Sequence, residues 1–206
     1  QAVGKLPVDV STIPVDMLSL SGHKLHAPKG VGALYVRKGT KLKPFMLGGH
    51  QENGRRAGTE NVPYIVGLGK ACELARMAVA KNEALVANLR DKLESGILAT
   101  CPDTRVNGAN AKRLPNTSSI SFEFIEGEAI LYHLSDLGIA ASSGSACASG
   151  SLEPSHVIRA MGIPFTAAHG TIRFSLSRYT TEDDVAYVLA HMPDIVERLR
   201  RLSPFI

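Results

Sequence analysis

The chain has 206 residues, with 23 lysine and arginine residues against 19 aspartate and glutamate residues, a net charge of +4 and a pI near 9.0. Hydrophobic residues make up 44% and charged residues 20%, a balance typical of a folded globular protein rather than a disordered one. The basic residues are scattered, tryptophan is absent and aromatics reach only 5%, so the composition disfavours a nucleic-acid interface. No stretch approaches the roughly 18 uninterrupted apolar residues of a membrane span. We therefore expect one large domain or parts of two, with neither nucleic acid nor membrane as a partner.

The three cysteines, Cys72, Cys101 and Cys147, are odd in number and far apart. They lack the CxxC or Cys/His spacing of a zinc site and the pairing of a disulfide framework. This usage predicts a reducing cytoplasm and no resident metal. The chain begins at Gln1 rather than at a methionine and no leader-like segment follows, which leads us to expect a fragment of a longer protein.

In the first half, two short apolar runs at residues 15–21 and 31–37 predict strands, separated by a turn-rich loop. The polar, glycine-rich residues 48–61 predict an exposed loop. Asn61 is the expected cap of a helix, and helical spacing of apolar residues then continues to Ile97. The sequence thus predicts one long helix or two in series, with Cys72 on its buried stripe.

The second half of the chain mixes predicted strands and predicted helices. Strands are predicted at residues 118–124, 138–141 and 171–176, and helices at residues 126–137 and 155–161. Residues 180–183 form a capping-box pattern that opens a final amphipathic helix ending near Arg201. Cys101 follows the long helix, and nothing in its surroundings suggests an activated thiol. Mixed elements without internal repeats predict an α/β architecture.

Lys24 closes the tetrapeptide Ser-Gly-His-Lys at the end of a predicted strand. A lysine flanked by a hydroxyl and an imidazole suits a covalent bond to a carbonyl cofactor, because the amine can be partly desolvated there. The polar neighbours also suit a cofactor phosphate. A surface lysine in a turn is the alternative interpretation.

Cys147 lies at the centre of residues 140–151, which have almost no side-chain bulk. Such a segment contributes little to a core, so the sequence predicts an accessible thiol, with an incidental cysteine in a linker as the alternative. Arg173 lies in a strand of otherwise apolar and small residues and needs an anionic partner. A substrate carboxylate and a structural ion pair both satisfy that need.

Four segments occur in order along the chain: SGHKLHAPKG, RAGTEN, SSGSACASGSLEPSHVIRAMG and TIRFSLSRYTTEDD. Together they resemble the NifS/IscS group of cysteine desulfurases, and the likeness to the nitrogenase-associated NifS branch is particularly close around Cys147. The resemblance runs from Gln1 to Pro204. It implies an α/β class V aminotransferase of fold-type I, with the C-terminal part of the large cofactor-binding domain in residues 1–80 and the small domain with the catalytic cysteine loop in residues 81–206.

The resemblance also implies roles for individual residues. Lys24 matches the lysine that bonds to pyridoxal 5′-phosphate (PLP), and Cys147 matches the cysteine that becomes a persulfide. The remaining matches are ligand contacts: Gln1 to the ring hydroxyl, Ser21 and His23 to the phosphate, Thr59 to the phosphate across a dimer, and Arg173 to the substrate carboxylate. No metal is implied, apart from a transient contact between Cys147 and an iron–sulfur cluster.

By the same resemblance, the whole protein is a cytoplasmic homodimer that converts L-cysteine to L-alanine. It passes the sulfur to an iron–sulfur scaffold protein, with the nitrogenase clusters of nitrogen fixation as one destination. The family's ring-stacking histidine, pyridine-nitrogen aspartate and substrate-binding asparagine lie upstream of Gln1, so we expect this chain alone to be inactive. The alternatives are a selenocysteine lyase, another class V aminotransferase such as a transaminase, and a non-catalytic interaction module.

Overall fold

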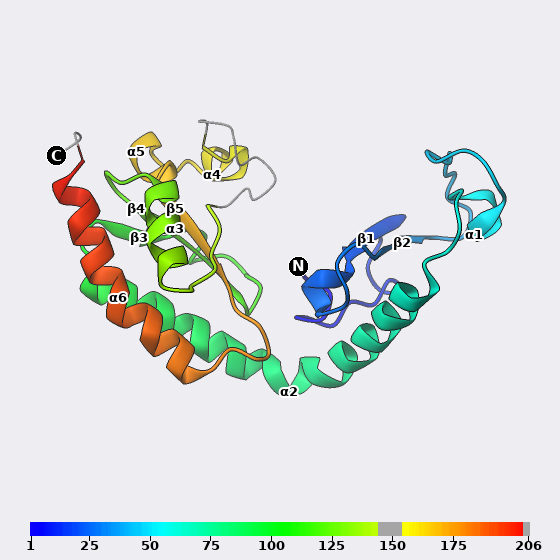
Figure 1. The fold of residues 1–206 in the computed structure, drawn as a ribbon, viewed down its shortest axis with the longest axis horizontal. Coiled ribbons are helices and arrows are strands. Elements are labelled where there is room, and N and C mark those ends of the chain that lie inside the picture. Colours follow the sequence, from blue (N-terminus) through cyan, green and yellow to red (C-terminus); the bar gives the residue numbers. More distant parts are fainter. Residues whose placement is uncertain (144–153, 204–206) are drawn as a thin grey trace. The chain divides into compact units, whose positions relative to one another are not determined.

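The structure, a computed structural model, describes residues 1–143 and 154–203 (Figure 1). Cys147 and most of its predicted segment, residues 144–151, lie outside the described residues. The chain forms two compact units, Gln1–Lys81 and Asn82–Ile206, and one helix, α2 (Val62–Thr100), contributes to both. The backbone nitrogen of Tyr64 donates to Asn61 Oδ1 at 3.4 Å, which confirms Asn61 as the cap. Of the two predicted alternatives, one long helix or two in series, the structure has one helix.

The first unit contains an antiparallel pair of strands, β1 (Met17–Ser21) and β2 (Gly32–Val36), with Met17 opposite Val36 and Ser21 opposite Gly32. Both strands were predicted. The loop between them begins with a single 3₁₀ turn, η1 (Gly22–Leu25). Within the predicted loop 48–61 the chain forms one irregular turn, α1 (Gln51–Gly54), in which Glu52, Asn53 and Gly54 all have positive φ.

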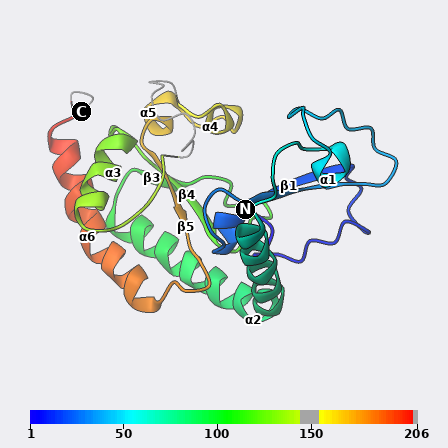
Figure 2. The same cartoon turned by 45° about the vertical axis from the view of Figure 1, so that its right-hand side comes forward.

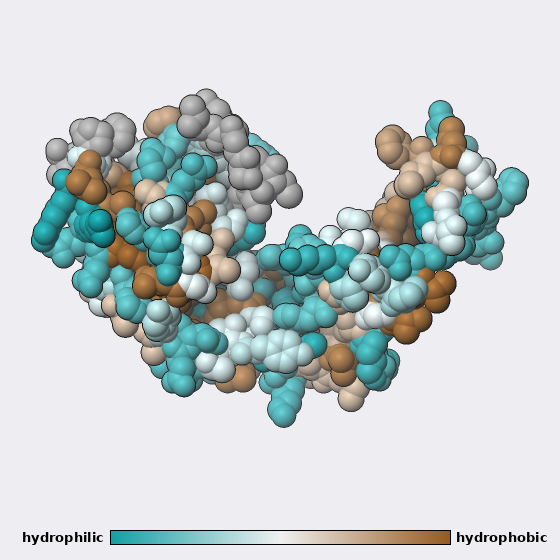
Figure 3. Space-filling model, in the orientation of Figure 1, coloured by the Kyte–Doolittle hydropathy of each residue, from teal (hydrophilic) through white to brown (hydrophobic). Residues whose placement is uncertain are grey.

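The core of the first unit is small. It consists of Leu25 from η1 and of Leu68, Ala71 and Ala75 from α2, and Cys72 packs against it half-buried rather than fully inside. Large apolar side chains stay exposed on the same unit: Phe45, Met46, Leu47, Val62, Ile65, Val66 and Met77. Part of this apolar surface is visible in brown over the first turns of α2 in Figure 3.

The second unit is built on an antiparallel sheet in the order β3-β4-β5, formed by β3 (Thr104–Val106), β4 (Thr117–Phe122) and β5 (Thr171–Ser175). The predictions of β4 and β5 are confirmed, whereas the three-residue β3 was missed. The predicted strand at 138–141 is wrong, because after Gly138 the chain is irregular until Ser142 forms an isolated bridge with Arg173.

In its described residues the second unit has four further helices: α3 (Gly127–Asp136), α4 (His156–Ala160), α5 (Phe165–Ala168) and α6 (Glu182–Arg201). The capping box of α6 lies one residue later than predicted, between Thr181 and Asp184. The reason is that the Thr180 hydroxyl already accepts a hydrogen bond from the backbone nitrogen of Ser177 at 2.9 Å, so Thr181 is left to cap the helix.

One face of the sheet packs on helices. Ile120, Phe122 and Ile172 are fully buried there, against apolar residues of α3, α6 and the second half of α2. Figures 1 and 2 show α6 running beside that half of α2. Gly96 permits the close approach, because a Cβ at this position would lie 2.6 Å from Leu189. Among the helices described, none is both long enough and apolar enough to span a bilayer.

Candidate functional site

The loop that carries Lys24 is fixed by packing against the core of the first unit and by backbone hydrogen bonds. Leu25 is 2% exposed and is anchored in the core of the first unit. The backbone nitrogen of Gly22 donates to Val31 O at 2.8 Å, and a Cβ on Gly22 would lie 2.8 Å from that oxygen. Only glycine therefore lets the loop close this tightly. The closure leaves Ser21, His23 and Lys24 exposed on one short turn.

The first residues of the chain lie against the same loop. Gly4 has a φ of +76°, and a Cβ on it would lie 2.6 Å from Leu25 Cδ2. This approach brings Gln1 beside the lysine loop, where Gln1, Ser21 and Lys24 line one pocket of about 350 Å³. That volume is within the range of about 300–1,000 Å³ common for small-molecule sites. An amide, a hydroxyl and an amine thus line one space, which fits the donors that the family resemblance implies around PLP.

His23 and Thr59 are placed differently. In the part of the chain that the structure describes, neither lines the pocket of Gln1, Ser21 and Lys24. Thr59 is exposed in the segment after α1, where Arg56 donates to the carbonyl oxygens of Ala57 and Gly58 at 3.3 and 3.1 Å and pairs with Glu52. Arg56 therefore orders the loop that presents Thr59.

Arg173 lies in β5, half-buried, directly opposite Ser119 of β4. On its other side the backbone of Arg173 exchanges two hydrogen bonds with Ser142, at 2.6 and 3.2 Å. Ser142 comes five residues before Cys147 in the sequence. The structure therefore places Arg173 next to the first residues of the predicted cysteine segment.

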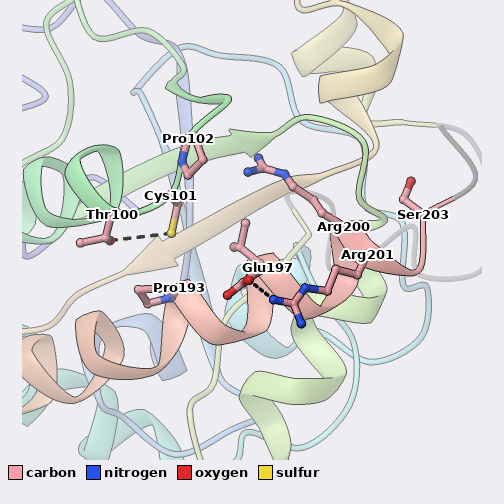
Figure 4. Close-up of a pocket in the computed structure, with 9 residues that line it drawn as sticks. Thr100, Cys101, Pro102, Pro193, Glu197, Arg200, Arg201 and Ser203 are labelled. Atoms are coloured by element: carbon pink, nitrogen blue, oxygen red, sulfur yellow. Dashed lines mark hydrogen bonds and ion pairs between the residues drawn. The ribbon is translucent and has the colours of Figure 1, made fainter. Parts of the chain in front are cut away.

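Cys101 lines a separate pocket of about 560 Å³ between the end of α2 and the last turns of α6 (Figure 4). Burial raises the pKa of the Cys101 thiol, and this outweighs the opposing effects of the Thr100 hydroxyl and the Arg200 charge. Arg200 donates to the carbonyl oxygens of Asp103 and Glu123, and Arg201 pairs with Glu197. Burial disfavours the thiolate and the charges around it are engaged, so this pocket lacks the features of a nucleophilic site.

Sequence reasoning missed several polar residues that shape the site regions. Arg37 donates to the carbonyl oxygens of Val10, Ile13 and Val15 at 2.7–3.0 Å and so fixes the segment before β1. Asn107, 4% exposed, donates to the hydroxyls of Ser119 and Ser121 beside Arg173. The one sequence signal at Asn107 is the glycine that follows it. This pair predicts a turn but does not indicate which residues the Asn107 side chain hydrogen-bonds.

Comparison with known proteins assigns the chain to a family. Residues 1–188 match the family Aminotransferase class-V, and the chain belongs to this family, whose members depend on PLP. It is 62% identical over 205 residues to a cysteine desulfurase of Nostoc sp. and, equally, to the cysteine desulfurase NifS of Azotobacter vinelandii. Both matches cover 100% of this chain and 51% of the relative, so the chain spans about half the length of the curated relatives it matches.

Solved structures give the same answer for the fold. A NifS-like protein matches with a TM-score of 0.83 at 38% identity, covering 97% of this chain and 51% of the other. DndA from Streptomyces lividans matches with a TM-score of 0.64 at 40% identity, covering 84% and 49%. The prediction of an α/β chain of the fold-type I class, similar to the NifS group, is confirmed.

Proposed function

We propose that the whole protein is a PLP-dependent cysteine desulfurase and that this chain supplies its cofactor lysine, its substrate-carboxylate arginine and its sulfur-accepting cysteine. The observation that carries the proposal is the pocket that Gln1, Ser21 and Lys24 share. Three residues matched to PLP contacts from two separate segments line one space of suitable size. When bound, PLP supplies an electron sink for the amino acid's α-carbon.

The proposed roles in the first unit follow from the donors present. Lys24 Nζ holds the cofactor and, once released, takes the proton from the substrate α-carbon. The hydroxyl of Ser21 and the imidazole of His23 donate to the phosphate, and Thr59 does so across a homodimer. The Gln1 amide donates to the ring hydroxyl. Lys24 is exposed in this chain, so we propose that residues from the rest of the protein complete its desolvation.

The proposed roles in the second unit are substrate binding and sulfur transfer. The planar fork of Arg173 matches the two oxygens of a carboxylate. Cys147 attacks the substrate sulfur as a thiolate: a sulfur–sulfur bond forms, the carbon–sulfur bond breaks, and the electron pair left on carbon is protonated to give alanine. The resulting persulfide passes its sulfur to an acceptor, for which we propose an iron–sulfur scaffold protein.

The proposal extends to the arrangement of the whole protein. Residues 1–80 are the end of the large domain and residues 81–206 the small domain of a cytoplasmic homodimer. The exposed apolar side chains of the first unit, including Phe45 at 97% and Leu47 at 82% exposure, are covered by the rest of the large domain or by the second subunit. This chain alone is then inactive.

The test is product analysis with the whole protein. L-cysteine should give alanine and, with a thiol reductant, sulfide in equal amounts, with an absorbance band from bound cofactor. A transaminase would give a keto acid in place of alanine. A selenocysteine lyase would act on selenocysteine and leave cysteine intact. Absence of both cofactor absorbance and product would support an interaction module and contradict the proposal.

A further inference from the structure

The sheet of the second unit has a polar face opposite its core face. Cross-strand partners share a face and neighbours along a strand alternate, so Ser119 with Arg173 and Ser121 with Thr171 lie on the side away from Ile120 and Ile172. Ser121 and Thr171 are 0% and 1% exposed. Burying hydroxyls is costly unless they are hydrogen-bonded, so this polar layer calls for an explanation.

The buried hydroxyls form a chain with Asn107 at its head. Asn107 Nδ2 donates to Ser121 Oγ at 2.8 Å, and Thr171 Oγ1 donates to the carbonyl oxygen of Ala167 at 3.1 Å. The remaining link, 2.7 Å between the hydroxyls of Ser121 and Thr171, is then donated by Ser121, because the single proton of Thr171 is already used. The chain runs in one direction, from Asn107 through both hydroxyls to α5.

Asn107 also reaches the residue opposite Arg173. Its Nδ2 donates to Ser119 Oγ at 3.2 Å, and its backbone nitrogen donates to Ser119 O at 2.8 Å. Ser119 faces Arg173 across the strands, and Thr171 precedes Arg173 on the same face of β5. Asn107 therefore hydrogen-bonds the cross-strand neighbour of Arg173 directly and reaches its neighbour along β5, Thr171, through Ser121.

We infer that Asn107 is a positioning residue, which holds the Arg173 fork in place for a substrate carboxylate through Ser119 and the Ser121–Thr171 chain. This inference rests on the proposed function. An arginine has many rotamers, so fixed polar neighbours across the strands and along β5 reduce what is lost when the fork closes on a ligand. A network that served stability alone would act equally on every ligand, whereas a positioning network acts on ligands that carry a carboxylate.

The test uses the whole protein with Asn107→Ala and a matched control, Asn116→Ala. Asn116 is equally buried, at 2% exposure, and its Nδ2 donates to the carbonyl of Leu176 at 3.1 Å, away from both neighbours of Arg173. We expect Asn107→Ala to raise the KM for L-cysteine about tenfold with little change in kcat, because about tenfold in affinity corresponds to the net contribution of a typical hydrogen bond. Asn116→Ala should lower the Tm and leave KM unchanged.

A milder pair of variants guards against misfolding of Asn107→Ala. Thr171→Val removes the hydroxyl that receives the hydrogen-bond chain and should raise KM, whereas Thr171→Ser keeps the hydroxyl and should retain the parent KM. Binding of cysteamine, which has the amine and thiol of cysteine but no carboxylate, should be the same in all variants when followed by cofactor absorbance.

Equal KM changes in the two asparagine variants would overturn the inference. So would matching KM values for the two Thr171 variants, or weaker cysteamine binding in Asn107→Ala. A parent protein that leaves L-cysteine intact would contradict the proposed function instead. The two failures can be told apart, because equilibrium binding of cysteine and cysteamine compares the variants without turnover.

Discussion

The two units differ in how much of their stability comes from their own residues. The second unit has a continuous core that joins its sheet to α3, α6 and half of α2, with Ile120, Ile130 and Met192 at 0% exposure. The first unit has a small core around Leu25 and leaves large apolar side chains in solvent. Burial of apolar surface is the dominant favourable term in folding. The first unit therefore gains less of this stabilisation from its own residues than the second unit.

Helix α2 shows the same contrast within one element. Ile97, in the second unit, is 0% exposed, whereas Ile65, in the first, is 45% exposed. Both lie in the same regular helix, so local propensity is equal and the difference comes from tertiary packing alone. The unit with the smaller core is also the one that carries the predicted cofactor lysine.

The largest expected effect tests that assignment. Lys24→Ala in the whole protein should abolish turnover and remove the covalent cofactor, because the amine that forms the bond is gone. Borohydride reduction followed by peptide mapping should place the pyridoxyl label on the Lys24 peptide of the parent. Lys29→Ala, in the same exposed loop, should keep the label. A label on any other lysine would show that the first unit does not carry the cofactor bond.

The next effect tests ligand binding by the second unit. Arg173→Ala should lower kcat/KM for L-cysteine by the equivalent of about 2–4 kcal/mol, mainly through KM, because a partly buried contact between a guanidinium and a carboxylate is lost. Arg173→Lys should restore part of the loss, since lysine keeps the charge and lacks the fork. Unchanged kinetics in Arg173→Ala would make Arg173 a structural residue.

A matched pair on α2 measures the difference between the units directly. Ile97→Val should lower the free energy of unfolding by about 1 kcal/mol, since it removes a methyl group from a filled core. Ile65→Val should have almost no effect in this chain, where its side chain is half in solvent. Urea unfolding of the chain and of the whole protein makes the comparison. A cost for Ile65→Val that appears only in the whole protein would show that this face is covered there, as proposed.

The smallest effect concerns the capping box of α6. The backbone nitrogen and the hydroxyl of Thr181 both donate to the carboxylate of Asp184. These two hydrogen bonds, the backbone one more strongly, lower the pKa of Asp184 below its ordinary value of 3.8. A lowered pKa in the folded state means that this contribution to stability is present above pH 3.8 and is lost as the pH falls through the lower, folded value. Asp184→Asn should therefore lower the Tm at neutral pH and have less effect in acid.

Asp183→Asn is the control for this prediction, because Asp183 is also exposed in the first turn and lies outside the capping box. An Asp184→Asn variant whose Tm difference from the parent is the same at neutral and acid pH would contradict the role of the box.

Local signals in the sequence predicted most of the elements correctly. The apolar runs around Leu20 and Ala33 became β1 and β2, and Asn61 caps α2 as expected. Competition between adjacent residues limited the accuracy, since Thr180 and Thr181 both suit a cap and only the turn at Ser177 decides between them. The predicted strand after Gly138 failed because an apolar run does not show whether a partner strand is available along its length.

The proximity of candidate site residues could be predicted where they are close in sequence. Ser21, His23 and Lys24 lie at one short turn, as the tetrapeptide predicts, and their roles stay predictions. The network of Asn107, Ser121 and Thr171 joins residues 14 and 50 positions apart, so it depends on a strand register that the sequence does not show. The role of Cys147 stays a prediction.

That role is also where the account is tested most directly. The whole protein, incubated without reductant with L-cysteine labelled at sulfur, should carry the label as a persulfide on the peptide that contains Cys147. Cys147→Ser should bind the cofactor and fail in sulfur transfer, because a hydroxyl is a far poorer nucleophile toward sulfur. Cys72→Ser and Cys101→Ser should keep most of the activity. A label on Cys72 or Cys101, or parent-rate turnover by Cys147→Ser, would contradict the mechanism.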